Sequence, residues 1–120
     1  MICSETCKII DFDLVHMKRE DVNFSASYQL NIHKTSTASA LITWFDCLFE
    51  NVKRKVKLST SPYEYYTHWK NTIFYIDKAY QVKDGDKLSG SIAVRQSKEN
   101  HRELDVKISY HHDKDTNSQV

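Results

Sequence analysis

Alternation of apolar and polar residues is the most regular pattern in the sequence, and it predicts β-strands. Between residues 22 and 32, apolar side chains occupy every second position, namely Val22, Phe24, Ala26, Tyr28, Leu30 and Ile32. A period of two places this set on one face of an extended chain, so the segment is predicted to be a half-buried strand. Shorter alternating stretches predict one-sided strands at residues 10–14 and 104–110.

Runs of strand-forming residues predict further strands at residues 40–49, 56–59, 72–77, 80–83 and 88–95. Residues 40–49 are apolar on both faces, which is typical of a central strand covered on both sides. Asp84-Gly85-Asp86 predicts a tight turn, because glycine tolerates a positive φ. Since no helical stripe is visible, we expect an all-β fold, an antiparallel β-barrel or sandwich of about seven or eight short strands.

Composition and charge limit the possible partners. Seventeen basic and sixteen acidic residues nearly cancel, so the charge gives no sign of direct nucleic-acid binding. No stretch approaches the ~18 apolar residues of a transmembrane helix, and no membrane partner is expected. The three cysteines, Cys3, Cys7 and Cys47, lack the paired spacing of a disulfide framework or a zinc site. A reducing compartment, the cytoplasm or the nucleus, is the simpler interpretation.

Cofactor and metal sites are not indicated by the residue pattern. The only glycines, Gly85 and Gly90, are five residues apart and cannot form a glycine-rich phosphate loop. The adjacent His111 and His112 would point to opposite faces of a strand, so they are expected to be solvated. We therefore predict that this chain binds neither a cofactor nor a metal ion.

The most informative short stretch is Thr67-His68-Trp69, directly before a predicted strand. In a purely structural interpretation, Trp69 plugs one end of the barrel and His68 hydrogen-bonds a neighbouring loop. In a functional interpretation, the two rings line a site, because positioned titratable groups concentrate at functional sites. The residues alone leave both interpretations open.

A resemblance to a known family favours the functional interpretation. Residues 58–62 (LSTSP) and 66–75 (YTHWKNTIFY) resemble the C-terminal β-barrel of protein arginine methyltransferases. The family's threonine-histidine-tryptophan loop is matched at Thr67-His68-Trp69, in a form similar to that of the type I members, which make monomethylarginine and asymmetric dimethylarginine. Asn71 stands where glutamine is usual in the family, and it retains an amide.

The resemblance extends over about residues 6–112. Residues 7–16 resemble the strand that follows the family's dimerisation arm, and residues 82–90 resemble a family hairpin. The implied organisation is a leader at residues 1–5, a β-barrel substrate-binding domain at residues 6–112, and a polar tail at residues 113–120.

The resemblance also implies roles for individual residues. In the family, a methyl group passes from S-adenosylmethionine to a protein arginine that is held by two glutamates of a Rossmann-like domain. By this likeness, His68 supports catalysis by pairing with an acidic residue on a helix of that domain. Thr67, Trp69 and Tyr66 are the implied substrate-binding residues, and the Trp69 ring offers a flat π surface to a guanidinium group. Arginine- and glycine-rich proteins are the implied substrates.

Several features of the family's complete enzymes, in the catalytic half and in the barrel, are missing from this sequence. It has no Rossmann-like segment, no glycine-rich cofactor loop, no glutamate hairpin and no helical dimerisation arm. We therefore expect an incomplete methyltransferase barrel that is inactive alone and binds no S-adenosylmethionine. An open strand edge and an uncovered apolar surface predict self-association unlike the family's dimer. The alternative is a free-standing β-sandwich that binds peptide or protein through residues 63–69.

Overall fold

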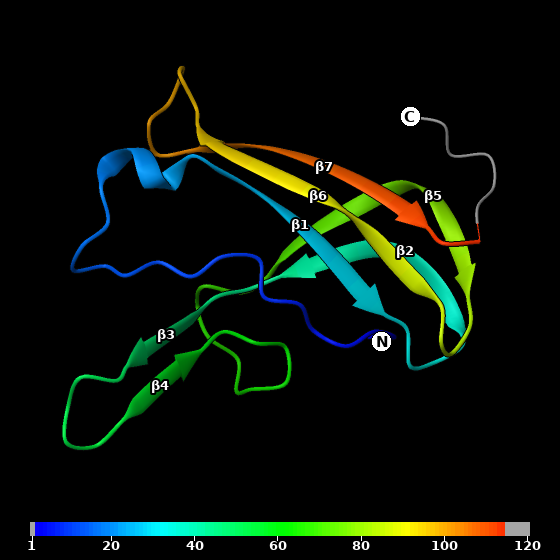
Figure 1. Cartoon of the computed structure of the whole chain (residues 1–120), viewed down its shortest axis with the longest axis horizontal. Coiled ribbons are helices and arrows are strands. Elements are labelled where there is room, and N and C mark those ends of the chain that lie inside the picture. The colour runs from blue at the N-terminus through cyan, green and yellow to red at the C-terminus, as the bar shows by residue number, and fades with distance from the viewer. Residues whose placement is uncertain (1, 115–120) are drawn as a thin grey trace. The chain divides into compact units, whose positions relative to one another are not determined.

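The computed structural model describes residues 2–114, and nearly all of their regular structure is β (Figure 1). One short 3₁₀ helix and seven strands follow one another as η1 (Arg19–Val22), β1 (Phe24–Asn31), β2 (Ser36–Thr43), β3 (Asp46–Phe49), β4 (Val56–Ser59), β5 (Thr72–Val82), β6 (Lys87–Gln96) and β7 (Leu104–His112). The predicted all-β class of about seven short strands is confirmed. Within the described range, no helical segment has the length and apolar character needed to span a membrane.

The chain divides into two compact units. The first unit comprises Met1–Thr37 and Gln81–Val120, and the second comprises Ala38–Tyr80. Strands β1, β6 and β7 form a three-stranded antiparallel sheet in the first unit, with β6 in the middle (Figure 1). Strands β3 and β4 form an antiparallel hairpin in the second unit, and β2 pairs with β5.

The core of the first unit is formed by residues of β1 and β6, by Ile32 directly after β1 and by Val82 at the end of β5. Its buried apolar side chains are Tyr28, Ile32, Val82, Leu88 and Ile92. Full burial of an aliphatic side chain of this size stabilises a fold by about 1.5–3 kcal/mol relative to exposure. The Tyr28 hydroxyl donates a hydrogen bond of 2.7 Å to the Ser109 carbonyl, so this ring also links β1 to β7 across the sheet.

Gly90 lies in β6 between Tyr28 of β1 and Tyr110 of β7. A Cβ atom at this position would lie only 1.9 Å from the carbonyl oxygen of Ser109 and 2.9 Å from the Tyr28 hydroxyl. The close approach of the β7 backbone therefore requires glycine here.

The predicted turn between β5 and β6 is present. The Asp86 N–H donates to the Lys83 carbonyl at 3.0 Å, and the Asp86 carboxylate accepts the Lys83 N–H at 2.9 Å. Gly85 has a φ of 90°, the left-handed conformation for which glycine is suited. This turn places the Asp86 side chain next to the end of β7.

The strand predicted at residues 10–14 is wrong. Residues 10–13 have no regular structure, and a turn follows at residues 14–16, where the backbone N–H groups of His16 and Met17 both donate to the Asp13 carbonyl. Leu14 is 73% exposed, so the alternation does not correspond to a buried face. A strand also needs a neighbouring strand to pair with, and the alternation of residues 10–14 does not show whether one is present.

The predicted central strand at residues 40–49 is also wrong. Strand β2 ends at Thr43, β3 begins at Asp46, and Leu48 and Phe49 are each about half exposed. The apolar run therefore spans two short strands that are not covered on both faces. The strands predicted at residues 72–77 and 80–83 are instead one continuous strand, β5.

Candidate functional site

The loop that connects β4 to β5, residues 60–71, contains the Thr67-His68-Trp69 stretch. Thr60, the first residue of the loop, is only 4% exposed and anchors the loop. The Thr60 hydroxyl accepts a hydrogen bond from the Phe45 N–H at 3.1 Å and donates one to the Phe45 carbonyl at 2.8 Å. The Thr60 N–H also donates to the same carbonyl at 3.0 Å. One buried residue thus ties the start of the loop to the β2–β3 connection.

The end of the loop is tied back to its beginning. The Asn71 side-chain amide donates a 2.6 Å hydrogen bond to the Thr60 carbonyl. Just before it, the Lys70 N–H donates to the Thr67 carbonyl at 3.2 Å, and Lys70 has a φ of 58°. The Asn71 amide therefore closes the base of the loop.

The aromatic rings of this loop contact one another on the surface. The His68 and Trp69 ring centroids are 3.9 Å apart and the rings are inclined by 35°. Trp69 also forms an edge-to-face pair with Phe45, with centroids 5.8 Å apart and an interplanar angle of 79°. Such edge-to-face aromatic pairs contribute about 0.5–1.5 kcal/mol beyond the area they bury. These contacts orient the indole and the imidazole together.

All four residues predicted for the site lie in this loop, and three of them are exposed. Trp69 is 52% exposed, Tyr66 is 80% exposed, and His68 is exposed as well. Thr67 is half-buried. An indole with half its surface open to solvent does not act as a plug for the core. The loop instead presents adjacent imidazole and indole rings at the surface.

Many large apolar side chains of the second unit are exposed, several of them in this loop. They are Phe45, Leu48, Phe49, Val52, Val56, Leu58, Tyr63, Tyr65, Tyr66, Trp69, Ile73 and Tyr75. Exposed large apolar side chains, where they gather in a patch, mark interaction sites in folded proteins. We refer to this set of residues as the apolar surface.

A short charged network stabilises the β3–β4 hairpin, which carries part of the apolar surface. The Ser59 hydroxyl donates to the Asp46 carboxylate, and the Lys57 ammonium group lies 3.2 Å from it. The Ser59 hydrogen bond, assisted by Lys57, holds the pKa of Asp46 below its ordinary value. Asp46 and Ser59 are directly opposite each other in the hairpin, so the network fixes its register.

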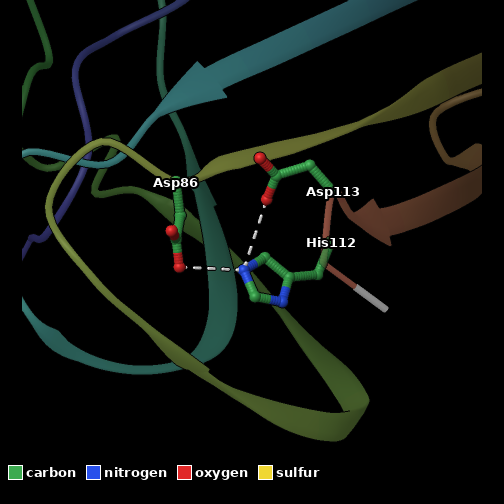
Figure 2. A group of neighbouring side chains, drawn as sticks. All are labelled: Asp86, His112 and Asp113. Carbon is green, nitrogen blue, oxygen red and sulfur yellow. Dashed lines mark hydrogen bonds and ion pairs between the residues drawn. The ribbon is translucent and has the colours of Figure 1, made fainter. Parts of the chain in front are cut away.

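A second cluster, in the first unit, was not predicted. His112 was expected to be solvated, and that prediction is wrong because His112 is only 7% exposed. Its Nε2 atom lies 3.1 Å from a carboxylate oxygen of Asp86 and 3.5 Å from one of Asp113 (Figure 2). The sequence did contain a signal, since extending the alternation of residues 104–110 by one step places His112 on the inward face.

Lys114 completes this cluster. Its ammonium group forms an ion pair with the Asp86 oxygen that does not face His112. The Lys114 ammonium, the Lys83 N–H and then His112 hold the pKa of Asp86 well below its ordinary value, against the opposing effect of burial. The same ion pair raises the pKa of Lys114. Asp86 is therefore ionised in the folded chain.

Comparison with protein families supports the resemblance seen in the loop. A family model described as "Arginine methyltransferase oligomerization subdomain" matches residues 1–116. The chain is similar to protein arginine N-methyltransferase 1 of Schizosaccharomyces pombe, with 39% identity over 107 residues that cover 89% of this chain and 32% of that protein. The Saccharomyces cerevisiae protein of the same name is 37% identical over 105 residues, which cover 86% of this chain and 30% of that protein. The chain thus spans about a third of the length of these relatives.

Two solved structures share the fold. One is the Trypanosoma brucei PRMT1 enzyme–prozyme heterotetrameric complex with AdoHcy, with a TM-score of 0.84 and 24% identity, covering 92% of this chain and 38% of the other. The second is Arabidopsis thaliana protein arginine methyltransferase 10, with a TM-score of 0.86 and 20% identity, covering 92% of this chain and 34% of the other. At these identities the likeness concerns the fold.

Proposed function

Because this chain belongs to the protein arginine methyltransferase family and corresponds to its C-terminal barrel domain, we propose that it forms the substrate-side wall of a type I arginine methyltransferase. In this proposal, a separate Rossmann-like domain binds S-adenosylmethionine and transfers its methyl group to an arginine guanidinium nitrogen, giving mono- and asymmetric dimethylarginine. The observation that carries the proposal is the anchored loop of residues 60–71, which presents His68 and Trp69 at the surface.

His68 is the proposed contact with the catalytic domain. Its ring is exposed, and its contact with Trp69 limits the directions in which its nitrogens can point. A hydrogen bond from this ring to a carboxylate on a helix of the catalytic domain is worth ~1.5–3 kcal/mol. If that energy is needed to dock the helix in the transition state, losing it slows turnover by about 10- to 150-fold.

Trp69, Tyr66 and Thr67 are the proposed substrate contacts. The exposed half of the indole can accept a guanidinium group against its face, an interaction worth about 0.5–2 kcal/mol. Arginine- and glycine-rich segments suit this site, because their glycines let a peptide backbone approach an aromatic wall closely. The proposed substrate-binding domain is residues 6–112. The predicted tail at residues 113–120 lies mostly outside the described residues.

The proposed partners follow from the apolar surface. A Rossmann-like catalytic domain would cover part of this surface and remove it from water. The matching family model is described as an oligomerization subdomain, which supports self-association of the chain as well. We propose that the isolated chain self-associates through the apolar surface, in an arrangement that differs from the family dimer. The cytoplasm or the nucleus remains the proposed location.

A direct test transplants this chain into a relative. Residues 6–112 would replace the matching segment of the Schizosaccharomyces pombe protein, and methylation of an arginine- and glycine-rich peptide would be measured. The chimera should be active, and His68→Ala should lower kcat by about 10-fold or more. His101→Ala, which removes an exposed imidazole outside the loop, is the matched control. Equal turnover of the two variants would refute the role of His68.

The same peptide tests the alternative function. Exposed Tyr63, Tyr65 and Tyr66 give the loop the character of a peptide-binding surface, which would support a free-standing β-sandwich that binds peptide or protein. Calorimetry of the isolated chain distinguishes the two functions. The methyltransferase proposal expects no specific heat with S-adenosylmethionine and only weak binding of the peptide. Tight peptide binding by the chain alone would favour the binding module.

A further inference from the structure

The cluster at the end of β7 places three metal-ligand side chains around one small space. A nitrogen of His112 and one oxygen each of Asp86 and Asp113 all lie within 4.8 Å of one another. Figure 2 shows Asp86 entering from the β5–β6 turn and His112 and Asp113 from the end of β7. Both carboxylates are directed at the same ring nitrogen of His112, at 3.1 and 3.5 Å.

Contrary to the expectation from the sequence, we propose that Asp86, His112 and Asp113 form a binding site for a divalent transition-metal ion, with Zn²⁺ as the best fit. Zinc binds imidazole nitrogen and carboxylate oxygen at about 2.0–2.2 Å in a tetrahedral arrangement. Ligand atoms at such distances are about 3.4 Å apart by geometry. The two separations at the His112 nitrogen bracket this value, so small movements of side chains suffice to admit the ion.

An ordinary histidine–aspartate pair does not account for the whole cluster. Asp86 is already satisfied by the Lys83 N–H, by Lys114 and by His112. One N–H at this His112 nitrogen can point well at only one of the two carboxylates, so the Asp86–His112 hydrogen bond alone does not explain the direction of the Asp113 carboxylate. A shared cation explains why two anionic groups converge on one nitrogen.

The charges of the cluster also favour a dication. Two carboxylates and the Lys114 ammonium leave one uncompensated negative charge when His112 is neutral. A divalent ion balances the charge of both carboxylates, and it supplies the positive charge that the buried carboxylate of Asp86 needs. Lys114 thus competes with a metal ion for the negative charge of Asp86, from the carboxylate oxygen that does not face His112.

The fold prepares two of the three ligands in advance. Asp86 is held by the turn hydrogen bond to Lys83, and pairing of Leu88 with His112 fixes the end of β7 against β6. Asp113 is 40% exposed at its side chain, so the ion has access from solvent on this side. Three protein ligands with a water molecule in the fourth position is the arrangement found in open zinc sites.

The test is titration of the full 120-residue chain, stripped with a chelator, with zinc chloride followed by calorimetry. Co²⁺ absorption would then report the coordination geometry. We expect one saturable ion per chain with the visible bands of tetrahedral Co²⁺. Asp113→Asn changes an exposed side chain and should weaken binding at least about 10-fold, while His112→Gln should abolish it. Circular dichroism would check that each variant is folded.

Two further variants make the result specific. Lys114→Gln removes the competing ammonium group and should tighten zinc binding by several fold, an effect that a structural ion pair does not produce. His101→Gln removes an exposed imidazole elsewhere and should leave the affinity unchanged. Absence of saturable binding to both the unmodified chain and Lys114→Gln would overturn the proposal. So would binding that Asp113→Asn leaves intact, since the ion would then lie elsewhere, for example at the cysteines.

Discussion

Replacement of Thr60 by valine tests whether one buried hydroxyl holds the candidate loop in place. Valine has nearly the shape of threonine, so Thr60→Val leaves no cavity at a side chain that is only 4% exposed. The change removes the two hydrogen bonds between the hydroxyl and the Phe45 backbone. It retains the third contact, from the Thr60 N–H to the Phe45 carbonyl.

The expected loss of stability follows from those two bonds. A hydrogen bond inside a protein contributes a net ~1 kcal/mol, and a donor that loses its buried partner costs somewhat more. Thr60→Val should therefore destabilise the second unit by about 2 kcal/mol. For a chain of this size, that corresponds to a fall in Tm of roughly 8 °C.

Tryptophan fluorescence is the appropriate assay, because both tryptophans, Trp44 and Trp69, lie in the unit Ala38–Tyr80. Thermal and urea unfolding of the unmodified chain would be compared with Thr60→Val and with Thr60→Ser, which keeps the hydroxyl. The serine variant should lie close to the unmodified chain. The reasoning fails if Thr60→Val melts within about 1 °C of the unmodified chain, or if both variants lose the same stability.

Two further changes test the first unit. Gly90→Ala forces a methyl group against the Ser109 carbonyl and should lower the free energy of unfolding by ~3 kcal/mol or more. Urea unfolding followed by circular dichroism measures this loss, and unchanged stability would mean that β6 and β7 are farther apart. The ion pair with Lys114 lowers the pKa of Asp86 from its ordinary 3.8. The ionised Asp86 side chain therefore stabilises the fold fully above about pH 4, and this stabilisation is lost as the pH falls through the lowered pKa. Acid unfolding should therefore depend less steeply on pH below 4 in Asp86→Asn, and identical slopes would contradict the ion pair.

The sequence predicted those strands in which the alternating apolar residues are also the side chains that are buried in the structure. The alternation of residues 22–32 identified β1 and its buried Tyr28, and β4 was predicted with the bounds that it has. The same rule failed at residues 10–14, because pairing depends on a neighbour that a local pattern does not supply. It also missed the break between β2 and β3, which the backbone contacts of Phe45 with Thr60 help to define.

The candidate site was predictable in part for similar reasons. His68 and Trp69 were identified by the resemblance of their short loop, which is a local feature. The anchor of that loop was not predicted, because Thr60 and Phe45 are 15 residues apart and meet only through pairing of β3 with β4. The Asp86–His112 contact joins residues 26 apart and depends on the register of β6 with β7. Contacts set by strand register lie beyond what local sequence patterns can show.

The most direct test of the central claim is hydrogen–deuterium exchange of residues 62–70 in two settings. The isolated chain would be compared with the chimera in which it is joined to the catalytic half of the Schizosaccharomyces pombe relative. The account predicts slower exchange of these amides in the chimera, because the exposed rings then face another domain, while the turn at residues 97–103 exchanges at the same rate in both. Equal exchange of residues 62–70 in the two settings would contradict it.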